Sequence, residues 1–142
     1  MRGSGRISKK DWYIEIAKVI SMRSTCLRAH AGAIIIVKDT IVSTGYNGAP
    51  RGEFNCCDIG ICERDRLKIR PGERYEICRS IHAEANAILN AARNGISVID
   101  GDMYIYFERL DRQKIKHGKP CLMCSRMMSN VGIKNYIFEE IV

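Results

Sequence analysis

The stretch SIHAEANAIL, Ser80 to Leu89, carries a histidine and a glutamate with one residue between them, where an alanine-rich helix begins. Inside a helix, residues two positions apart point to nearly opposite sides. His82 and Glu84 can therefore share a site only at the helix start. Side chains of the first turn lean back toward the helix N-terminus, so we expect the Glu84 carboxylate to reach a ligand held by His82.

A second helix start lies further along the chain, at PCLMC, Pro120 to Cys124. Cys121 and Cys124 are three positions apart and are neighbours on one helix face. The positive end of the helix dipole favours thiolates there. With His82 as a third ligand, these residues predict a zinc site that leaves the fourth coordination position open, as catalytic zinc sites do.

The rest of the chain alternates between helical and strand-like patterns. Short β-branched runs separated by Lys38-Asp39 predict a hairpin, and the segment from Glu53 to Arg79 predicts a long shaped loop. We expect an α/β fold, a sheet covered by helices, built as one domain over residues 1–142. The expected helices are 8–24, 82–94 and 121–131, and the expected strands are 33–37, 40–45, 102–107 and 134–138.

Composition narrows the class of protein. The chain has 142 residues, 46% of them hydrophobic and 27% charged, which is typical of a compact domain. The longest apolar run, Ala31 to Val37, is too short to span a bilayer, and the first residues lack the apolar core of a signal peptide. We expect a cytoplasmic protein without a membrane partner. Seven cysteines then indicate metal ligands or reduced thiols rather than disulfides, and the net charge of +7 suits a phosphate-bearing ligand or a nucleic acid.

His-x-Glu followed by Pro-Cys-x-x-Cys is the signature of zinc-dependent nucleobase deaminases. The loop TGYNG, Thr44 to Gly48, and the segment from Ser24 to Asp39 resemble the deoxycytidylate (dCMP) deaminase family. The resemblance extends from about Trp12 to Phe138. It implies a three-layer α/β/α fold of the cytidine deaminase type, with a mixed, mostly five-stranded sheet.

The resemblance also implies an activity, the hydrolytic deamination of dCMP to dUMP. Zinc makes hydroxide available near neutral pH for attack on C4, and Glu84 is expected to shuttle protons to ring N3 and to the departing ammonia. Asn47 and the backbone around Ala83 are expected to hold the sugar and the base. The candidates for phosphate binding are three arginines next to matching motifs: Arg28, Arg51 and Arg79.

Five cysteines are not used by the catalytic metal. Some members of the dCMP deaminase family carry a second, structural zinc, bound after the first helix and in the loop before the His-x-Glu motif. The resemblance therefore implies a four-thiolate site here. Its expected ligands are Cys26, Cys56, Cys62 and Cys78, with Cys57 as a spare or substitute. The alternative without a metal is that these cysteines are small buried hydrophobic residues.

One departure from the family is the segment FERLDRQKIKHGK, Phe107 to Lys119, which precedes the second cysteine motif. We expect this insertion to reshape access to the base or to contribute phosphate contacts. Relatives form homo-oligomers and respond to dCTP and dTTP, so both are expected here. Two alternatives stay open: a deaminase of a base in tRNA or other RNA, and an inactive zinc-bearing nucleic-acid-binding protein. TGYNG argues against the first and an intact Glu84 against the second, so a nucleic-acid partner is not expected.

Overall fold

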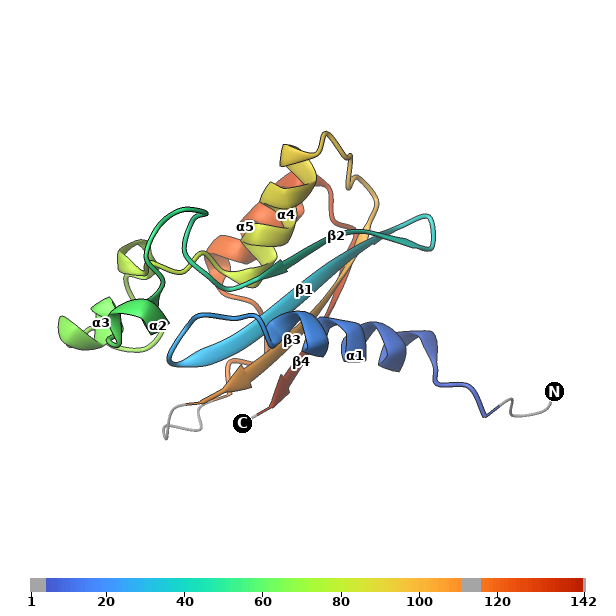
Figure 1. Ribbon diagram of the computed structural model, residues 1–142. Coiled ribbons are helices and arrows are strands. Elements are labelled where there is room, and N and C mark those ends of the chain that lie inside the picture. The colour runs from blue at the N-terminus through green and yellow to red at the C-terminus, as the bar shows by residue number, and fades with distance from the viewer. Residues whose placement is uncertain (1–4, 111–115, 142) are drawn as a thin grey trace.

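The computed structural model describes residues 5–110 and 116–141, which form a four-stranded sheet with helices on both faces (Figure 1). The three-layer α/β/α prediction is confirmed, but the described residues contain four strands rather than five. The segment from 53 to 82 has little alternating apolar pattern, and it forms short helical turns instead of a further strand. The elements in chain order are α1 Lys9–Ser21, β1 Ala29–Val37, β2 Thr40–Tyr46, α2 Cys56–Ile59, α3 Glu63–Arg66, the 3-10 turn η1 Tyr75–Ile77, α4 Ala83–Arg93, β3 Asp102–Arg109, α5 Leu122–Val131 and β4 Asn135–Ile141.

The sheet has the strand order β2-β1-β3-β4. β1 pairs antiparallel with β2 and with β3, whereas β3 and β4 run parallel and are connected through α5. The predicted hairpin is confirmed, and its two turn residues, Lys38 and Asp39, have φ values of 50° and 64°. Two residues with positive φ match the twist of the strands they join.

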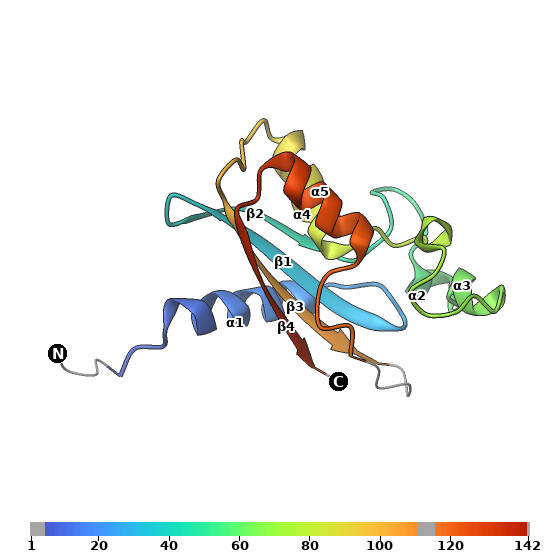
Figure 2. The ribbon, with the colours of Figure 1, turned by 180° about the vertical axis from the view of Figure 1, so that it is seen from behind.

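Helices cover the two faces of the sheet differently. α1 lies on one face, while α4 and α5 lie side by side on the other, as both views show (Figures 1 and 2). Alternate residues of β1 face the two layers. Ala33 and Ile35 pack toward α4 and α5, and Ile34 and Ile36 pack toward α1. The central strand is therefore buried on both faces.

Two glycines allow helices to lie directly on the strands. A Cβ at Gly45 of β2 would lie 2.3 Å from the backbone nitrogen of Ala87 in α4. A Cβ at Gly32 of β1 would lie 2.1 Å from the carbonyl oxygen of Ala17 in α1. Displacing either backbone would disrupt packing, because each belongs to a helix that packs against the sheet. Gly45, in the TGYNG sequence, thus fixes how closely α4 approaches the sheet.

The predicted loop from Glu53 to Arg79 is held by internal polar contacts. Arg64 is buried, and its guanidinium donates to the carbonyl oxygens of Glu73 and Arg70 at 3.0 and 2.7 Å. The same guanidinium carbon lies 4.7 Å from the centroid of the Tyr75 ring. These contacts give a loop without a core of its own a defined shape beside the N-terminus of α4. Within the described residues, no helix has the length and apolar character needed to cross a membrane.

Candidate active site and metal centre

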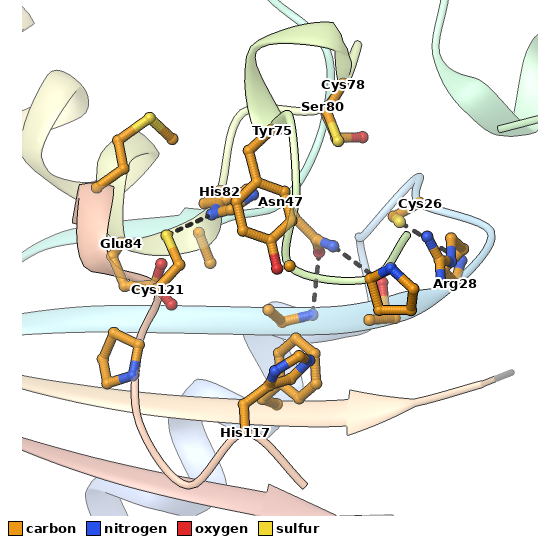
Figure 3. Close-up of a pocket in the computed structure, with 18 of the residues that line it drawn as sticks. Cys26, Arg28, Asn47, Tyr75, Cys78, Ser80, His82, Glu84, His117 and Cys121 are labelled. Carbon is orange, nitrogen blue, oxygen red and sulfur yellow. Dashed lines mark hydrogen bonds between the residues drawn. The ribbon is translucent and has the colours of Figure 1, made fainter. Parts of the chain in front are cut away.

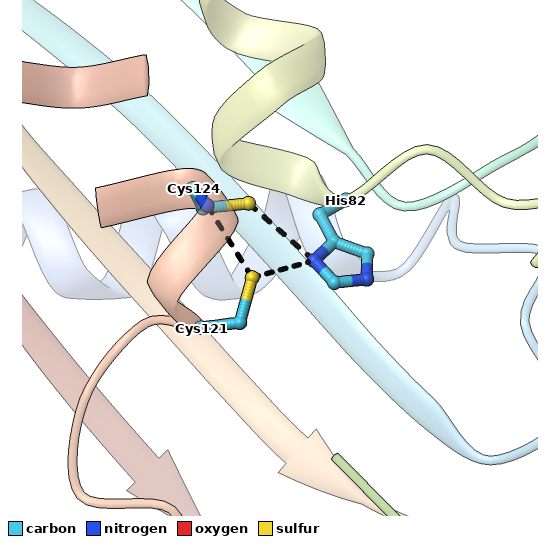
Figure 4. A group of neighbouring side chains, drawn as sticks. All are labelled: His82, Cys121 and Cys124. Carbon is cyan, nitrogen blue, oxygen red and sulfur yellow. Dashed lines mark hydrogen bonds between the residues drawn. The ribbon is translucent and has the colours of Figure 1, made fainter. Parts of the chain in front are cut away.

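The starts of α4 and α5 meet at one point, where they bring three metal-binding side chains together (Figure 4). His82 is the N-cap residue of α4 and Cys121 is the N-cap residue of α5. Nδ1 of His82 lies 3.3 Å from Sγ of Cys121 and 3.4 Å from Sγ of Cys124. All three donor atoms lie within 4.8 Å of one another.

These distances fit a zinc ion. Tetrahedral coordination with ordinary bond lengths separates a nitrogen and a sulfur ligand by about 3.5 Å. Two thiols and one imidazole are also ligands that zinc prefers. Among the residues that the structure describes, this is the one group of three or more potential ligands that meets the distance requirement. With three protein ligands, the site has room for one small exchangeable ligand.

The three ligand side chains form hydrogen bonds with one another. A hydrogen bond with the thiol of Cys124 lowers the pKa of Cys121 to about 4 despite the opposing effect of burial, and His82 adds to the lowering. The pKa of Cys124 is raised by the same hydrogen bond and by burial. Burial acts to lower the pKa of His82, but hydrogen bonds with the thiols of Cys121 and Cys78 raise it to about 10. Metal binding must therefore release protons from His82 and Cys124.

Glu84 lies in the first turn of α4 and is only 5% exposed. Burial raises the pKa of its carboxyl group, while His82 and a hydrogen bond with the thiol of Cys124 act in the opposite direction. Glu84 lines the same pocket as His82 and Cys121. The arrangement places a carboxyl group beside the metal ligands, where it can exchange protons with a water molecule.

A pocket of about 370 Å³ opens in front of the metal site. β1, the loop before α4 and the chain before α5 contribute to its walls (Figure 3). Asn47 and Ala83, the two residues predicted to hold the sugar and the base, both line it. The basic side chains around it are Arg28, Arg64, Arg79, Arg109, His117 and Lys119. A pocket of this size, with a reactive end and several cations, suits a small anionic ligand.

Asn47 also has a structural role that the sequence did not indicate. Its Oδ1 accepts from the backbone N–H of Ala31 at 2.9 Å and from the hydroxyl of Ser24, and its Nδ2 donates to the carbonyl oxygen of Ala29 at 2.9 Å. An amide nitrogen has two hydrogens, so Nδ2 can donate to a ligand as well as to Ala29. The side chain therefore ties the loop to β1 at the floor of the pocket.

The three arginines predicted to bind phosphate separate into two groups. Arg28 and Arg79 line the pocket, with Nη1 of Arg28 3.5 Å from Oδ1 of Asp65. Arg51 is not among the residues that line the pocket. Its guanidinium donates to Oδ1 of Asn90 in α4 at 2.8 Å, on an exposed part of the surface. The geometry thus favours Arg28 and Arg79 over Arg51.

The four cysteines predicted to form a second metal site lie along the pocket wall. The pKa of Cys26 is raised mainly by burial, and the neighbouring thiols of Cys56 and Cys62 add to the shift. The thiols of Cys62 and Cys78 likewise contribute to the raised pKa of Cys56, again after burial. The four cysteines thus line one pocket, but no three of their sulfurs lie within 4.8 Å of one another. Cys57 is exposed.

Tyr75 and His117 are pocket residues that the sequence analysis did not single out. The rings of Tyr75 and His82 meet edge to face, with centroids 4.8 Å apart. No pattern in the sequence predicts that Tyr75 lines the pocket, because its position depends on the irregular turn η1. His117 belongs to the predicted insertion, whose basic composition was the available signal. Part of that insertion, residues 111–115, lies outside the described residues.

An α/β/α fold in which two helix starts hold an imidazole, two thiols and a neighbouring buried carboxylate defines a class of zinc-dependent hydrolytic enzymes. The family model for the cytidine and deoxycytidylate deaminase zinc-binding region matches residues 7–140. The chain therefore belongs to the cytidine and deoxycytidylate deaminase family.

Individual relatives agree with this assignment. The chain is 31% identical over 94% of its length to the deoxycytidylate deaminase of Mycobacterium phage D29, and it covers 98% of that protein. It is 30% identical over 94% of its length to the deoxycytidylate deaminase of Schizosaccharomyces pombe but spans only 38% of that longer protein. The fold resembles the dCMP deaminase of cyanophage S-TIM5 in complex with dCMP and dUMP. That likeness has a TM-score of 0.69 at 24% identity and covers 96% of this chain and 86% of the other.

Proposed function

We propose that this chain, as one deaminase domain, catalyses the hydrolytic deamination of dCMP to dUMP. The observation that carries the proposal is the placement of His82, Cys121 and Cys124 beside the buried Glu84 in a pocket with basic walls. Relatives of similar sequence named deoxycytidylate deaminase support the choice of nucleotide. The reaction consumes one water molecule and releases one ammonia molecule.

Zinc held by the three ligands would supply a water molecule acidic enough to act as a nucleophile at neutral pH. Glu84 takes the proton of the attacking water and delivers it to N3 of the cytosine ring, while oxygen bonds to C4. The carboxylate then takes the second proton from the new hydroxyl group on C4 and hands it to the amino group, as the C4 carbonyl forms, the C4–N4 bond breaks and ammonia leaves. Its burial keeps bulk water away from these transfers.

The pocket residues have separate binding roles in this proposal. The backbone at Ala83 contacts the base, and the second N–H of the Asn47 amide contacts the sugar. Arg28 and Arg79 bind the phosphate, because a guanidinium offers several donors in a geometry that matches phosphate oxygens. Five donors allow Arg28 to keep its contact with Asp65 while it binds a ligand.

An ammonia-release assay across dCMP, CMP, dCTP, deoxycytidine and a tRNA tests the proposal. We expect dCMP to give the highest kcat/KM, and we expect Glu84→Gln to lower kcat by a factor of at least about 10² while zinc stays bound. Glu53→Gln, at an exposed position that does not line the pocket, is the matched control. Release of ammonia from tRNA alone, or an active Glu84→Gln protein, contradicts the proposal.

A second zinc ion, bound by Cys26, Cys56, Cys62 and Cys78, is a further part of the proposal. The placement of all four cysteines along one pocket wall supports it, and so does the need of a long loop for an anchor. Metal analysis of the pure protein should give two zinc ions per chain and one in Cys26→Ser. One zinc ion per chain in both proteins would exclude the second site.

Homo-oligomeric assembly, regulation by dCTP and dTTP, and a cytoplasmic location complete the proposal. The support for all three is the resemblance to the family. Sedimentation analysis should show an assembly larger than the 16.1 kDa chain. Rate measurements with dCMP should change when dCTP or dTTP is added, and a rate unaffected by either nucleotide would remove the regulatory part.

A further inference from the structure

A short segment between β3 and α5, residues 116–120, is attached to the end of the sheet by one carboxylate. The backbone N–H of His117 donates to both oxygens of Glu140, at 2.8 and 2.9 Å, and the N–H of Gly118 donates to Oε1 at 3.2 Å. Gly118 has a φ of 72°, which a residue with a side chain rarely adopts. We call residues 116–120 the His117 arm. Its N–H groups converge on Glu140 as they would on a bound anion.

The imidazole of His117 is held as well. Its ring meets the ring of Phe107 edge to face, with centroids 5.8 Å apart. Its Nε2 lies 2.8 Å from Nη1 of Arg109. Phe107 is the register partner of Glu140 across β3 and β4. One end of this strand pair therefore fixes both the backbone and the side chain of His117.

The arm forms part of the pocket wall. His117, Lys119 and Pro120 line the pocket, and the next residue is the metal ligand Cys121. In Figure 3, His117 lies below the pocket in the view, and Tyr75 and Asn47 lie above it. The position of His117 thus limits the space that a ligand can occupy beyond the metal site.

The contact with Arg109 determines which atom of His117 can bind a ligand. A guanidinium only donates hydrogen bonds, so Nε2 of His117 is the acceptor. The ring N–H that remains for a ligand is on Nδ1. The base must lie at the other end of the pocket to reach Glu84, and a donor on the wall suits the sugar–phosphate part of a nucleotide. Lys119 adds a cation to the same wall.

We propose that His117 binds the phosphate of the nucleotide and that Glu140 is the positioning residue that holds the His117 arm in place. The inference rests on the proposed deamination of dCMP. It assigns a binding role to a segment that departs from the family pattern, and it assigns a positioning role to a carboxylate on β4 that does not line the pocket.

Steady-state kinetics of Glu140→Gln, with Glu139→Gln as the control, test the inference. Glutamine places an N–H donor against the N–H groups of the arm and removes the charge. Glu139 is the neighbouring residue on the same strand, is exposed and is the register partner of Tyr106 in β3. We expect Glu140→Gln to raise KM for dCMP about tenfold, with kcat changed less than about threefold and kcat/KM for deoxycytidine nearly unchanged. Glu139→Gln should match the unmodified protein.

A double-mutant cycle with His117→Ala distinguishes positioning from general damage. If Glu140 acts through His117, the double variant should raise KM no more than the larger single effect. Multiplicative effects, or equal losses with dCMP and deoxycytidine, overturn the inference. So does a Glu140→Gln protein that behaves like Glu139→Gln while the unmodified protein deaminates dCMP. If the unmodified protein deaminates no nucleotide, the proposed function fails instead.

Discussion

Nδ1 of His82 lies 3.4 Å from Sγ of Cys124, although 42 positions separate the two residues in the chain. The contact exists because α4 and α5 lie side by side on one face of the sheet and begin at the same edge (Figure 2). Each helix start leaves backbone N–H groups without partners inside the helix, which favours thiolates and other anions there. The metal centre is thus a consequence of how two helices are placed on one sheet.

Replacement of Cys124 by serine should remove the metal. A thiolate binds zinc far better than a hydroxyl group, so we expect less than about one tenth of the site to retain zinc after dialysis, with deaminase activity lost in proportion. Cys57→Ser is the matched control, because Cys57 is exposed and does not line the pocket. Metal content and activity measured on the same preparations check this. Full activity in a zinc-depleted Cys124→Ser protein would contradict the assignment of the ligands.

Chelation should unload the metal more readily at low pH. Binding displaces protons from His82 and Cys124, whose pKa values are raised before metal binds. Protons therefore compete with zinc, and the apparent affinity should fall as pH is lowered. Competition titrations with a chromophoric chelator between pH 6 and pH 8, corrected for protonation of the chelator, measure the effect. An affinity independent of pH would mean that the ligands are not protonated in the free protein.

Arg28→Ala should weaken the binding of the nucleotide through its phosphate. Loss of a hydrogen bond to a charged group costs about 1.5–3 kcal/mol, which corresponds to a rise in KM for dCMP of about 10- to 150-fold. KM for deoxycytidine, which has no phosphate, should change little. Arg51→Ala is the control, because Arg51 contacts Asn90 outside the pocket. Equal effects of the two substitutions would remove Arg28 from the phosphate site.

Asn47→Ala should destabilise the fold in addition to any effect on binding. The substitution leaves the buried N–H of Ala31 without its acceptor, whereas the carbonyl oxygen of Ala29 keeps the hydroxyl of Ser24 at 3.3 Å as a donor. One unsatisfied buried group costs about 1–3 kcal/mol, so we expect a loss of about 1–3 kcal/mol in the free energy of unfolding. Urea denaturation checks this, with Asn135→Ala as an exposed control that loses one contact with Asp102. A loss below about 1 kcal/mol would show that the loop re-forms these bonds elsewhere.

Gly45→Ala, at the end of β2, should lower stability more than Gly48→Ala in the loop that follows. The new Cβ at Gly45 meets backbone atoms of α4 at 2.3 and 2.6 Å, whereas at Gly48 it first meets the side-chain oxygen of Thr25 at 3.2 Å. Overpacking costs about 1–3 kcal/mol. The melting temperatures and zinc contents of both variants check this, since displacement of α4 also moves His82. Equal melting temperatures would show that α4 can shift without cost.

Local sequence patterns were enough to predict most elements. Ser8 caps α1 by accepting from the N–H of Asp11, and Gly132 ends α5 with a φ of 97°, as the residue types indicate. The spacing of His82 and Glu84 at the start of α4 and that of Cys121 and Cys124 at the start of α5 predicted the metal site from equally local patterns. These signals act within a few residues, so they can be read without knowledge of the tertiary structure.

Which residues line the pocket depends on contacts between segments that are distant in the sequence. Arg28 and Arg51 look alike in the sequence, yet only the first lines the pocket. His117 reaches the same pocket because a carboxylate 23 positions away holds its backbone. The described residues form four strands rather than the five expected from the family.

The sequence by itself determined the helices, the hairpin and the chemical set of one imidazole, two thiols and one carboxylate. Each of these follows from residue types at short, regular spacings, where local sterics and hydrogen bonding dominate. Only the tertiary structure decided which cations face the ligand, how Asn47 is tied to β1 and where the His117 arm lies. These features arise from packing between segments that no local pattern connects.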